Sequence, residues 1–421
     1  MMLKITFPTA LILSFGILVS RSYGVIPTAL GWYQIPNTQL QSVCPSNNFG
    51  GSNYAFANNC DAVTTAWNSG AFDSNRNRLI IWGGGHSDYS GNEIYALDLK
   101  TEKMVRVTDP GAPAAGCPEA IAGGAQPNSR HTYDGISFMP NADRLFVVGG
   151  SLATCGGMSE GTWTFDFKTN KWQDMKVSGS HPSGVPGIVS AFDPNTGKVF
   201  VHDDGKLYAY DIATNNYAVL LENARIDYHM TAVIDPKRKK MVILGGGEQW
   251  IIDISGTGGY KQVALGSTGG GSIIGTTSPG LAYDAAEDKI VAWQGGNSAY
   301  ALNLDTKAWT AVTFTGGPGS AMNNGTIGRW DYVPSLNAFV VVNSVDNNAY
   351  TLRWSTKSGV IKPLQGSRRS PRTGAIILMP GEPFAKGNLA QANTWDMGGR
   401  WLRLLPNPAG RAANAVRILT P

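Results

Sequence analysis

Charged side chains are scarce in this sequence. Only 15% of its 421 residues are Asp, Glu, Lys or Arg, whereas an average soluble domain has roughly 25%. Long solvated helices, coiled coils and helical solenoids all draw on Glu, Lys and Arg, so the composition argues against these architectures. The sequence also lacks any block of basic residues. We therefore do not expect nucleic acid as a partner, because general electrostatic binding of a polyanion needs such blocks.

Long apolar runs are missing outside the N-terminus. There, Lys4 is followed by an apolar stretch over residues 10–19. Residues 22–24 then have the pattern of small residues typical of a cleavage site. This order predicts a secretory signal peptide over residues 1–24. The stretch is shorter than the ~20 residues that a bilayer needs, so we expect cleavage rather than an uncleaved anchor, and a secreted or periplasmic chain without a membrane span. Removing Lys4 and Arg21 with the leader lowers the net charge from +4 to +2.

Cysteine is rare as well, and its spacing is not that of a metal site. The sequence has four cysteines, without a C-x-x-C motif and without a histidine beside any of them. An exported chain meets an oxidising environment, so two disulfides are expected among three possible pairings. We favour the near neighbours, Cys44 with Cys60 and Cys117 with Cys155. We expect no cofactor; a structural ion on Asp88, Asp203 or Asp204 is conceivable, but no spacing supports it.

Glycine and aromatic residues are abundant, and they recur in a repeat. The sequence has 52 Gly and 12 Trp, and 42% of its residues are apolar, which favours many short strands joined by tight turns around a large core. Each repeat holds a strand, a turn, an apolar strand and often a diglycine, and then an aromatic residue followed three positions later by Asp, as in Tyr95 and Asp98. Six copies are clear, and they begin near residues 63, 129, 184, 229, 278 and 328.

The unit of ~40–50 residues, its diglycine and its late aromatics resemble the kelch repeat, which forms one four-stranded blade of a β-propeller. This resemblance implies an all-β fold, with aromatics between neighbouring blades and Asp side chains that bond backbone amides in the turns. We expect a single seven-bladed propeller over residues 25–421. Strands from both termini would close the ring, because the seventh blade must be assembled from residues 370–421 and 30–37.

Histidine is rare, with five copies, and three of them fall on the two kinds of loop that propellers place at one mouth of the channel. His86 follows the first diglycine, His131 enters the second blade and His229 enters the fourth. By propeller architecture such loops meet at one mouth of the central channel. His202 could line the channel or be a hydrogen-bonded residue at a strand end, and His181 is expected in a surface loop. Phenols and guanidiniums accompany the three favoured histidines at Tyr89, Arg130, Tyr133, Arg225, Tyr228, Arg329 and Arg372.

These residue types resemble those of propeller polysaccharide lyases such as the ulvan lyases. The resemblance implies β-elimination on an acidic, uronate-containing polysaccharide, in which an arginine neutralises the carboxylate, a base removes the α-proton and a phenol protonates the leaving oxygen. His131 or His86 is the candidate base, and Tyr228 or Tyr133 the candidate acid. Arg225, or else Arg130, would neutralise the carboxylate. The candidate substrate-binding residues are Arg130, Tyr89, Arg329 and Arg372.

Two other functions compete with a lyase. A non-catalytic, monomeric propeller could bind glycans or proteins at the same mouth, and fold alone does not decide between them. The adjacent Tyr228 and His229 resemble copper ligands of galactose-oxidase-like propellers. That family needs a second histidine downstream, however, and no histidine follows His229 in this sequence.

Overall fold

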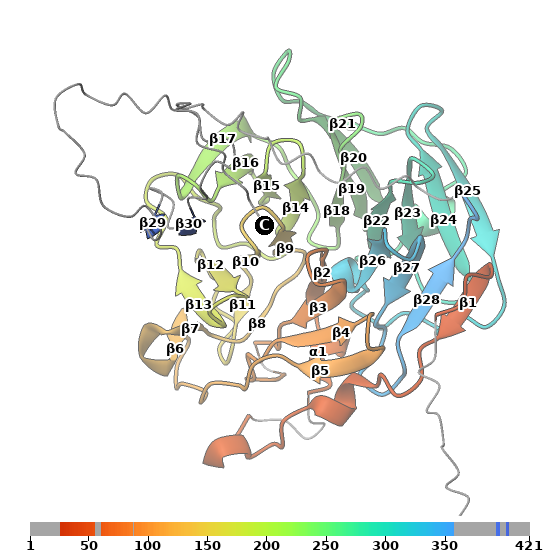
Figure 1. Ribbon diagram of the computed structural model, residues 1–421. Coiled ribbons are helices and arrows are strands. Elements are labelled where there is room, and N and C mark those ends of the chain that lie inside the picture. The colour runs from red at the N-terminus through yellow and green to blue at the C-terminus, as the bar shows by residue number, and fades with distance from the viewer. Residues whose placement is uncertain (1–25, 55–59, 87, 358–392, 396–400, 404–421) are drawn as a thin grey trace, which may run out of the picture. The chain divides into compact units, whose positions relative to one another are not determined.

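Six four-stranded antiparallel sheets make up the propeller (Figure 1). The computed structural model describes residues 26–54, 60–86, 88–357, 393–395 and 401–403. From the innermost strand outward, the blades are: blade 1, β2 (Ser69–Asp73), β3 (Arg78–Trp82), β4 (Tyr95–Asp98) and β5 (Lys103–Arg106); blade 2, β9 (Ile136–Met139), β10 (Arg144–Val148), β12 (Thr162–Asp166) and β13 (Lys171–Asp174); blade 3, β14 (Val189–Asp193), β15 (Lys198–His202), β16 (Lys206–Asp211) and β17 (Asn216–Glu222); blade 4, β18 (Thr231–Asp235), β19 (Lys240–Gly245), β20 (Glu248–Asp253) and β21 (Gln262–Ala264); blade 5, β22 (Gly280–Asp284), β23 (Lys289–Trp293), β24 (Ser298–Asn303) and β25 (Ala308–Thr313); and blade 6, β26 (Trp330–Val333), β27 (Ala338–Val341), β28 (Tyr350–Arg353) and β1 (Gly31–Gln34).

The remaining elements are short and lie between the blades or near the termini. They are α1 (Ala62–Thr65), α2 (Gly271–Ile274), the 3-10 helices η1 (Leu40–Val43), η2 (Phe49–Gly51), η3 (Ala122–Gly124) and η4 (Ile327–Arg329), and the paired strands β6 (Ala120–Ile121) with β7 (Gln126–Pro127), β8 (Arg130–His131) with β11 (Ser151–Leu152), and β29 (Asn393–Trp395) with β30 (Trp401–Arg403). None of the described helices is long and apolar enough to cross a membrane.

The ring closes after six blades, so the expectation of seven is wrong. The N-terminal strand β1 pairs with β28, with Gly31 opposite Arg353 and Gln34 opposite Tyr350, and it becomes the outermost strand of blade 6. The innermost strand of that blade, β26, contacts β2 of blade 1 directly. The segment expected to complete a seventh blade from the N-terminal side therefore fills an edge in the sixth. Residues 367–421 form a separate unit, of which only the β29–β30 hairpin is described.

The repeat residues have the structural roles expected of them. Asp98 accepts the amides of Lys100 and Thr101 in the turn after β4, and Asp166 accepts those of Lys168 and Thr169 in the next blade. Aromatic side chains pack between neighbouring blades, where the Trp82 and Trp172 ring centroids are 5.1 Å apart and the Trp293 and Trp330 rings stack at 6.0 Å. Second strands such as β3 read as unbroken apolar runs because blades cover both of their faces.

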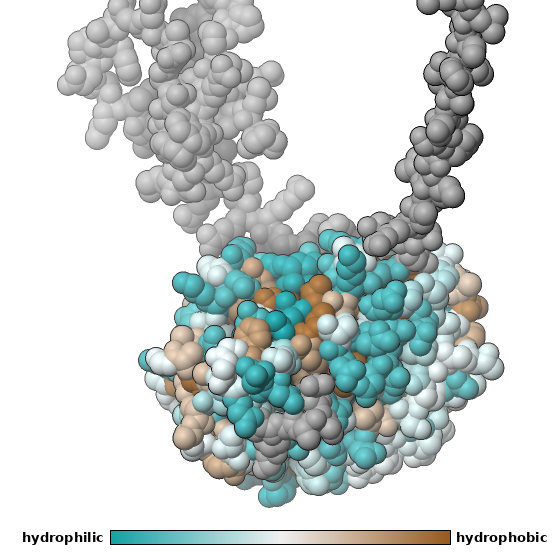
Figure 2. All heavy atoms as spheres, turned by 90° about the horizontal axis from the view of Figure 1, so that it is seen from below, coloured by the Kyte–Doolittle hydropathy of each residue, from teal (hydrophilic) through white to brown (hydrophobic). Residues whose placement is uncertain are grey.

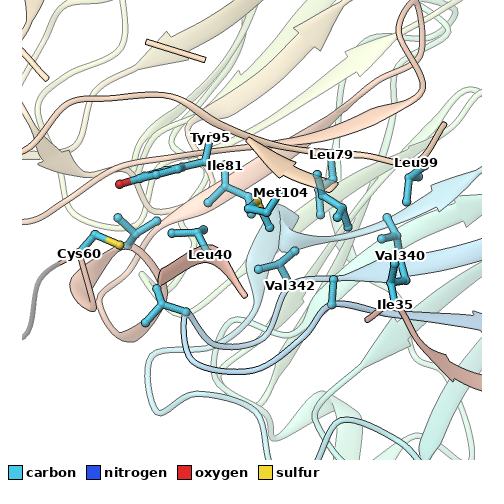
Figure 3. Close-up of a cluster of buried hydrophobic side chains, with 14 of the residues drawn as sticks. Ile35, Leu40, Cys60, Leu79, Ile81, Tyr95, Leu99, Met104, Val340 and Val342 are labelled. Carbon is cyan, nitrogen blue, oxygen red and sulfur yellow. The ribbon is translucent and has the colours of Figure 1, made fainter. Parts of the chain in front are cut away.

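A hydrophobic cluster joins blade 6 to blade 1, where the ring closes (Figure 3). Leu79 and Ile81 of β3 meet Val340 of β27, and Leu40 of η1 covers them from the N-terminal segment. Cys60 lies in the same cluster and forms a disulfide with Cys44. On the face seen in Figure 2, hydrophilic residues surround smaller groups of hydrophobic ones.

Candidate functional site

Four of the candidate residues line one cavity of about 200 Å³ on the face of the propeller formed by the loops that enter the innermost strands. They are His86, from the β3–β4 loop, His131 and Tyr133, which precede β9, and Tyr228, which precedes β18. Trp67 and Pro186 complete the lining. The structure therefore brings together side chains from blades 1, 2 and 4, as expected from the position of their loops. We call this space the histidine cavity.

His131 is held in place from several sides. Its backbone pairs with Ser151 across the β8–β11 ribbon, and its ring is 1% exposed and lies 5.3 Å from the Trp67 ring. The Nε2 atom is 2.5 Å from Oδ2 of Asp88. Gly85 permits this approach, since a Cβ there would stand 2.5 Å from both atoms. If the neutral imidazole donates its Nε2–H to Asp88, its Nδ1 atom carries the lone pair and is the atom that can accept a proton.

Opposing effects set the proton affinity of His131. Burial lowers its pKa from the ordinary value, because the charged imidazolium is poorly solvated there, while Asp88 acts in the opposite direction. His86 lies beside it, with 4.7 Å between the ring centroids, and further lowers the pKa of His131. His131 is therefore a neutral base with a fixed orientation at neutral pH.

Two tyrosines face the same cavity with different exposures. Tyr133 is buried, and burial together with the nearby Tyr228 raises its pKa to about 12, so its phenol keeps its proton. Tyr228 is 42% exposed, and its ring centroid is 3.5 Å from that of His229. Gly187 packs against the same loop, and a Cβ there would lie 2.0 Å from the Cα of Tyr228. Tyr228 is thus the phenol that a large ligand can reach.

His229 acts on this site through its neighbour. Its Nδ1 atom is 2.7 Å from Oδ1 of Asp227, which also accepts the backbone amide of His229. His229 is not among the residues that line the histidine cavity, and its ring packs against Tyr228 at a tilt of 41°. The structure therefore places His229 as a support for Tyr228 and not as a group facing the cavity.

Two of the candidate arginines are structural. Arg130 donates to Asn128, Gly149, Ser159 and Glu119, and these bonds use all its donor nitrogens. Arg329 is equally buried and gives five hydrogen bonds to backbone carbonyls, from loops before and within blade 6 and from the segment before blade 1. Neither guanidinium has a donor left for a ligand. The substrate-binding role expected for both residues, and the second choice of Arg130 as carboxylate neutraliser, are replaced by a role in the fold.

The other candidate substrate-binding residues and Arg225 also lie apart from the histidine cavity. Tyr89 is buried and donates its hydroxyl to Glu93. The Arg225 side chain is 81% exposed, pairs with Asp204 at 2.7 Å and lines a separate recess of about 300 Å³ beside Trp250. Arg372 lies outside the described residues. No arginine of the described chain lines the histidine cavity.

The acidic residues considered as ligands of an ion are engaged elsewhere. Asp88 holds His131 and Asp204 holds Arg225. Asp203 accepts hydrogen bonds from four neighbouring residues, Ser183, Gly205, Lys206 and Tyr208. Buried His202 is a bonded strand-end residue, with Nε2 2.8 Å from Oε1 of Gln262. Within the described ranges there is no group of three or more His, Cys, Asp or Glu residues suited to a metal.

Both disulfides join the cysteines that we paired from the sequence, and one of them lies next to the histidine cavity. The amide of Gly157 points at the sulfurs of Cys117 and Cys155, at 3.3 Å from each. Gly156 lies against His86, since a Cβ on it would be 3.4 Å from the imidazole ring. The residue that follows Cys155 in the chain therefore packs against His86.

Sequence reasoning missed the partner of His131 and the aromatic floor of the cavity. Asp88 stands two residues after His86 in a glycine-rich loop, but nothing in the sequence pairs it with a histidine 43 residues later. Trp67 lies two residues before β2, much as Tyr133 and Tyr228 each lie three residues before β9 and β18. That equivalence of position within the repeat was the available signal.

Comparison with known proteins adds little to this site. No family model matches the chain, and no curated protein matches it. A crystal structure of TolB from Acinetobacter baumannii is similar to it with a TM-score of 0.37 and 15% sequence identity, over 59% of this chain. The match spans about half of TolB, 54% of its length. A likeness at this level carries no argument about function, so the β-propeller assignment rests on the six sheets themselves.

Proposed function

We propose that this chain is a secreted polysaccharide lyase that cleaves uronate-containing glycans by β-elimination. The observation that carries the proposal is the His131–Asp88 pair, a buried imidazole oriented by a carboxylate inside a cavity that also holds a reachable phenol. An oriented, neutral base beside a proton donor is what this elimination needs. The apolar leader over residues 1–24, which lies outside the described residues, and the two disulfides support export.

In the proposed reaction the free nitrogen of His131 takes the proton from C5 of the uronate. The electron pair of that C–H bond forms the C4–C5 double bond, and the C4–O bond to the next sugar breaks. Tyr228 gives its proton to the departing oxygen and recovers one from His131 for the next cycle. Asp88 stabilises the imidazolium that exists between these steps.

In this proposal His86, and not Arg225, neutralises the carboxylate of the uronate. Arg225 is on the same loop as Tyr228 but lines a different recess and pairs with Asp204. His86 lies 4.7 Å from His131, ring to ring, and lines the same cavity. A hydrogen bond from His86 to the uronate carboxylate would favour loss of the adjacent proton, as an arginine would.

A non-catalytic glycan-binding propeller is the second candidate. The exposed ring of Tyr228 favours it, because aromatic faces stack on sugars without any need for proton transfer. The two candidates differ in whether His131 must change its protonation state during each encounter with the glycan.

The deciding experiment incubates the purified protein with ulvan, pectate, alginate and glucuronate-bearing gums and follows the absorbance of the unsaturated uronate. A lyase gives increasing absorbance, and His131→Ala reduces the rate by about 10²–10⁴-fold, as expected for a lost general base. His181→Ala is the matched control, because His181 is not among the cavity residues. Saturable glycan binding without any absorbance change across the panel would reject the lyase and leave the binding module.

A further inference from the structure

A second space opens on the same face of the propeller as the histidine cavity, between blades 5 and 6, which are neighbours in the ring (Figure 1). Its walls are residues 276–279, which enter β22, residues 320–326, which lead into β26, and Gln294 in the turn between β23 and β24. Loops of the same two kinds carry the residues of the histidine cavity. The space has a volume of about 250 Å³, and we call it the blade 5–6 pocket.

The lining of the blade 5–6 pocket is polar but uncharged. Seven of its eleven residues carry a hydroxyl or an amide side chain, and none of the eleven is Asp, Glu, Lys, Arg or His. Ser320 and Asn323 are exposed, and Thr277 is half-buried. Within the described ranges no hydrogen bond occupies the side chains of these three residues. Their hydroxyl and amide groups are therefore available to a ligand.

Backbone contacts hold the three walls of the pocket together. The amide of Thr326 donates to the carbonyl of Ser278 at 2.9 Å, which joins the loop before blade 6 to the loop before blade 5. Gly295 bridges to Ser320, and a Cβ on this glycine would stand 2.3 Å from the nitrogen of Ala321. Because these contacts use backbone atoms, the pocket is formed before a ligand arrives and its side chains can be exchanged without losing them.

The blade 5–6 pocket adjoins the histidine cavity. The amide of Ser278, in the lining of the pocket, donates to the carbonyl of His229 at 2.7 Å. The residue before His229 is Tyr228, which lines the histidine cavity. One residue and one hydrogen bond therefore separate the two linings, so a single ligand chain that passes Tyr228 can reach both spaces.

We propose that the blade 5–6 pocket binds a neutral sugar of the glycan whose uronate lies in the histidine cavity, an inference that rests on the proposed function. A carboxylate or sulfate would find no cationic partner in this lining, and an unpaired charge is costly to desolvate. Sugar hydroxyls find hydroxyl and amide partners there. Met322 and Ala321 add apolar surface for the C–H face of a sugar ring. The substrate is therefore a glycan in which uronates stand beside neutral sugars, and not a chain of uronates alone.

Calorimetric titration of the full-length protein with two tetrasaccharides tests this pocket. One alternates glucuronate with galactose, and the other is tetragalacturonate. We expect the alternating chain to bind at least about tenfold more tightly, and Asn323→Ala to weaken its binding roughly 2- to 10-fold, as for one lost hydrogen bond. The same variant should bind tetragalacturonate as the wild type does. Asn216→Ala is the matched control, because Asn216 is also exposed but lines neither space.

Thr277→Val is the second variant, which keeps the shape of the side chain and removes only its hydroxyl. It should retain the melting temperature of the wild type and weaken binding of the alternating chain. The inference is overturned if tetragalacturonate binds as tightly as the alternating chain, or if both variants bind the alternating chain as the wild type does. The lyase fails separately, if the alternating chain is bound but never gives the absorbance of an unsaturated uronate. A protein that binds neither tetrasaccharide overturns both proposals.

Discussion

Replacement of Arg329 by methionine tests whether this residue belongs to the fold or to a ligand site. Its guanidinium is fully buried and donates to the carbonyls of Asn68, Val342, Asn343, Thr64 and Gly325, at 2.6–3.1 Å. Burial lowers its pKa to about 9, so it is still charged at neutral pH. The five bonds connect blade 6, and the segment that leads into it, with the segment just before blade 1.

The structure gives the size of the effect. Hydrogen bonds from a charged group contribute about 1.5–3 kcal/mol each, so losing five costs roughly 8 kcal/mol at the lower end. Relief from burying the ion returns several kcal/mol, about 4 kcal/mol by the usual scale of that penalty. We therefore expect Arg329→Met to lower the free energy of unfolding by about 4 kcal/mol, a large share of the ~5–15 kcal/mol typical of a domain.

The assay is denaturation by urea at pH 7, followed by tryptophan fluorescence. Arg225→Met is the matched control, because its exposed pair with Asp204 should contribute no more than about 1 kcal/mol. If Arg329→Met lies within about 1 kcal/mol of the wild type and impairs glycan binding instead, the structural role is refuted and the substrate-binding role returns.

Three further predictions concern the histidine cavity. Burial lowers the pKa of His131 below its ordinary value and Asp88 opposes this shift, so the lyase rate should fall at acid pH only below the usual histidine range. Asp88→Asn should move this acid limb to still lower pH in a pH–rate profile, and an unmoved limb would exclude Asp88 as the partner of His131. Gly187→Ala should displace the Tyr228 loop and weaken glycan binding, measured by calorimetry, since the added Cβ meets the backbone at 2.0 Å; unchanged binding would place the ligand elsewhere. Replacing Cys117 and Cys155 by serine should shift the NMR signals of the His86 imidazole, because Gly156, which lies against that ring, directly follows the bridged Cys155.

The other disulfide supplies the control for the last prediction. The Cys44–Cys60 bridge lies in the hydrophobic cluster between blades 6 and 1. Removing either bridge should lower the free energy of unfolding by about 2–4 kcal/mol. When the Cys44–Cys60 bridge is removed, the His86 signals should stay in place in the folded protein. Equal shifts in both variants would indicate a general loosening of the fold.

The repeat made the blades predictable from the sequence, but the way the ring closes was not. Each repeat carries its own strand, turn and aromatic signals within ~50 residues, as Tyr95 and Asp98 illustrate, so local physics decides the blade. The number of blades depends on whether β1 pairs with β28 or with a later segment. The candidate partners of β1 are strands far from it in the sequence and similar in composition. No local sequence pattern therefore predicts which of them it pairs with.

The candidate site, too, was predictable from the sequence only in part. Repeat position alone predicted that His86, His131 and Tyr228 would gather on one face, because equivalent loops end at equivalent places. It did not distinguish a guanidinium facing solvent from one turned inward. Arg130 and Arg329 stand beside ligand-facing positions in the sequence, yet each satisfies backbone carbonyls, and those carbonyls come from loops whose course only the folded chain shows.

The pairing of β1 with β28 also sets the order in which the chain can fold. Gln34 and Tyr350 are bonded across 316 residues, so the strand that is synthesised first must wait for nearly all of the propeller before it has a partner. Contacts of such long sequence separation slow folding, because the chain must be ordered before they form. Until then β28 presents an unpaired edge that other strands can join. A chain exported from its N-terminus would therefore cross the membrane with its closing strand in front and its ring open, and aggregation through blade 6 is the hazard that this topology creates.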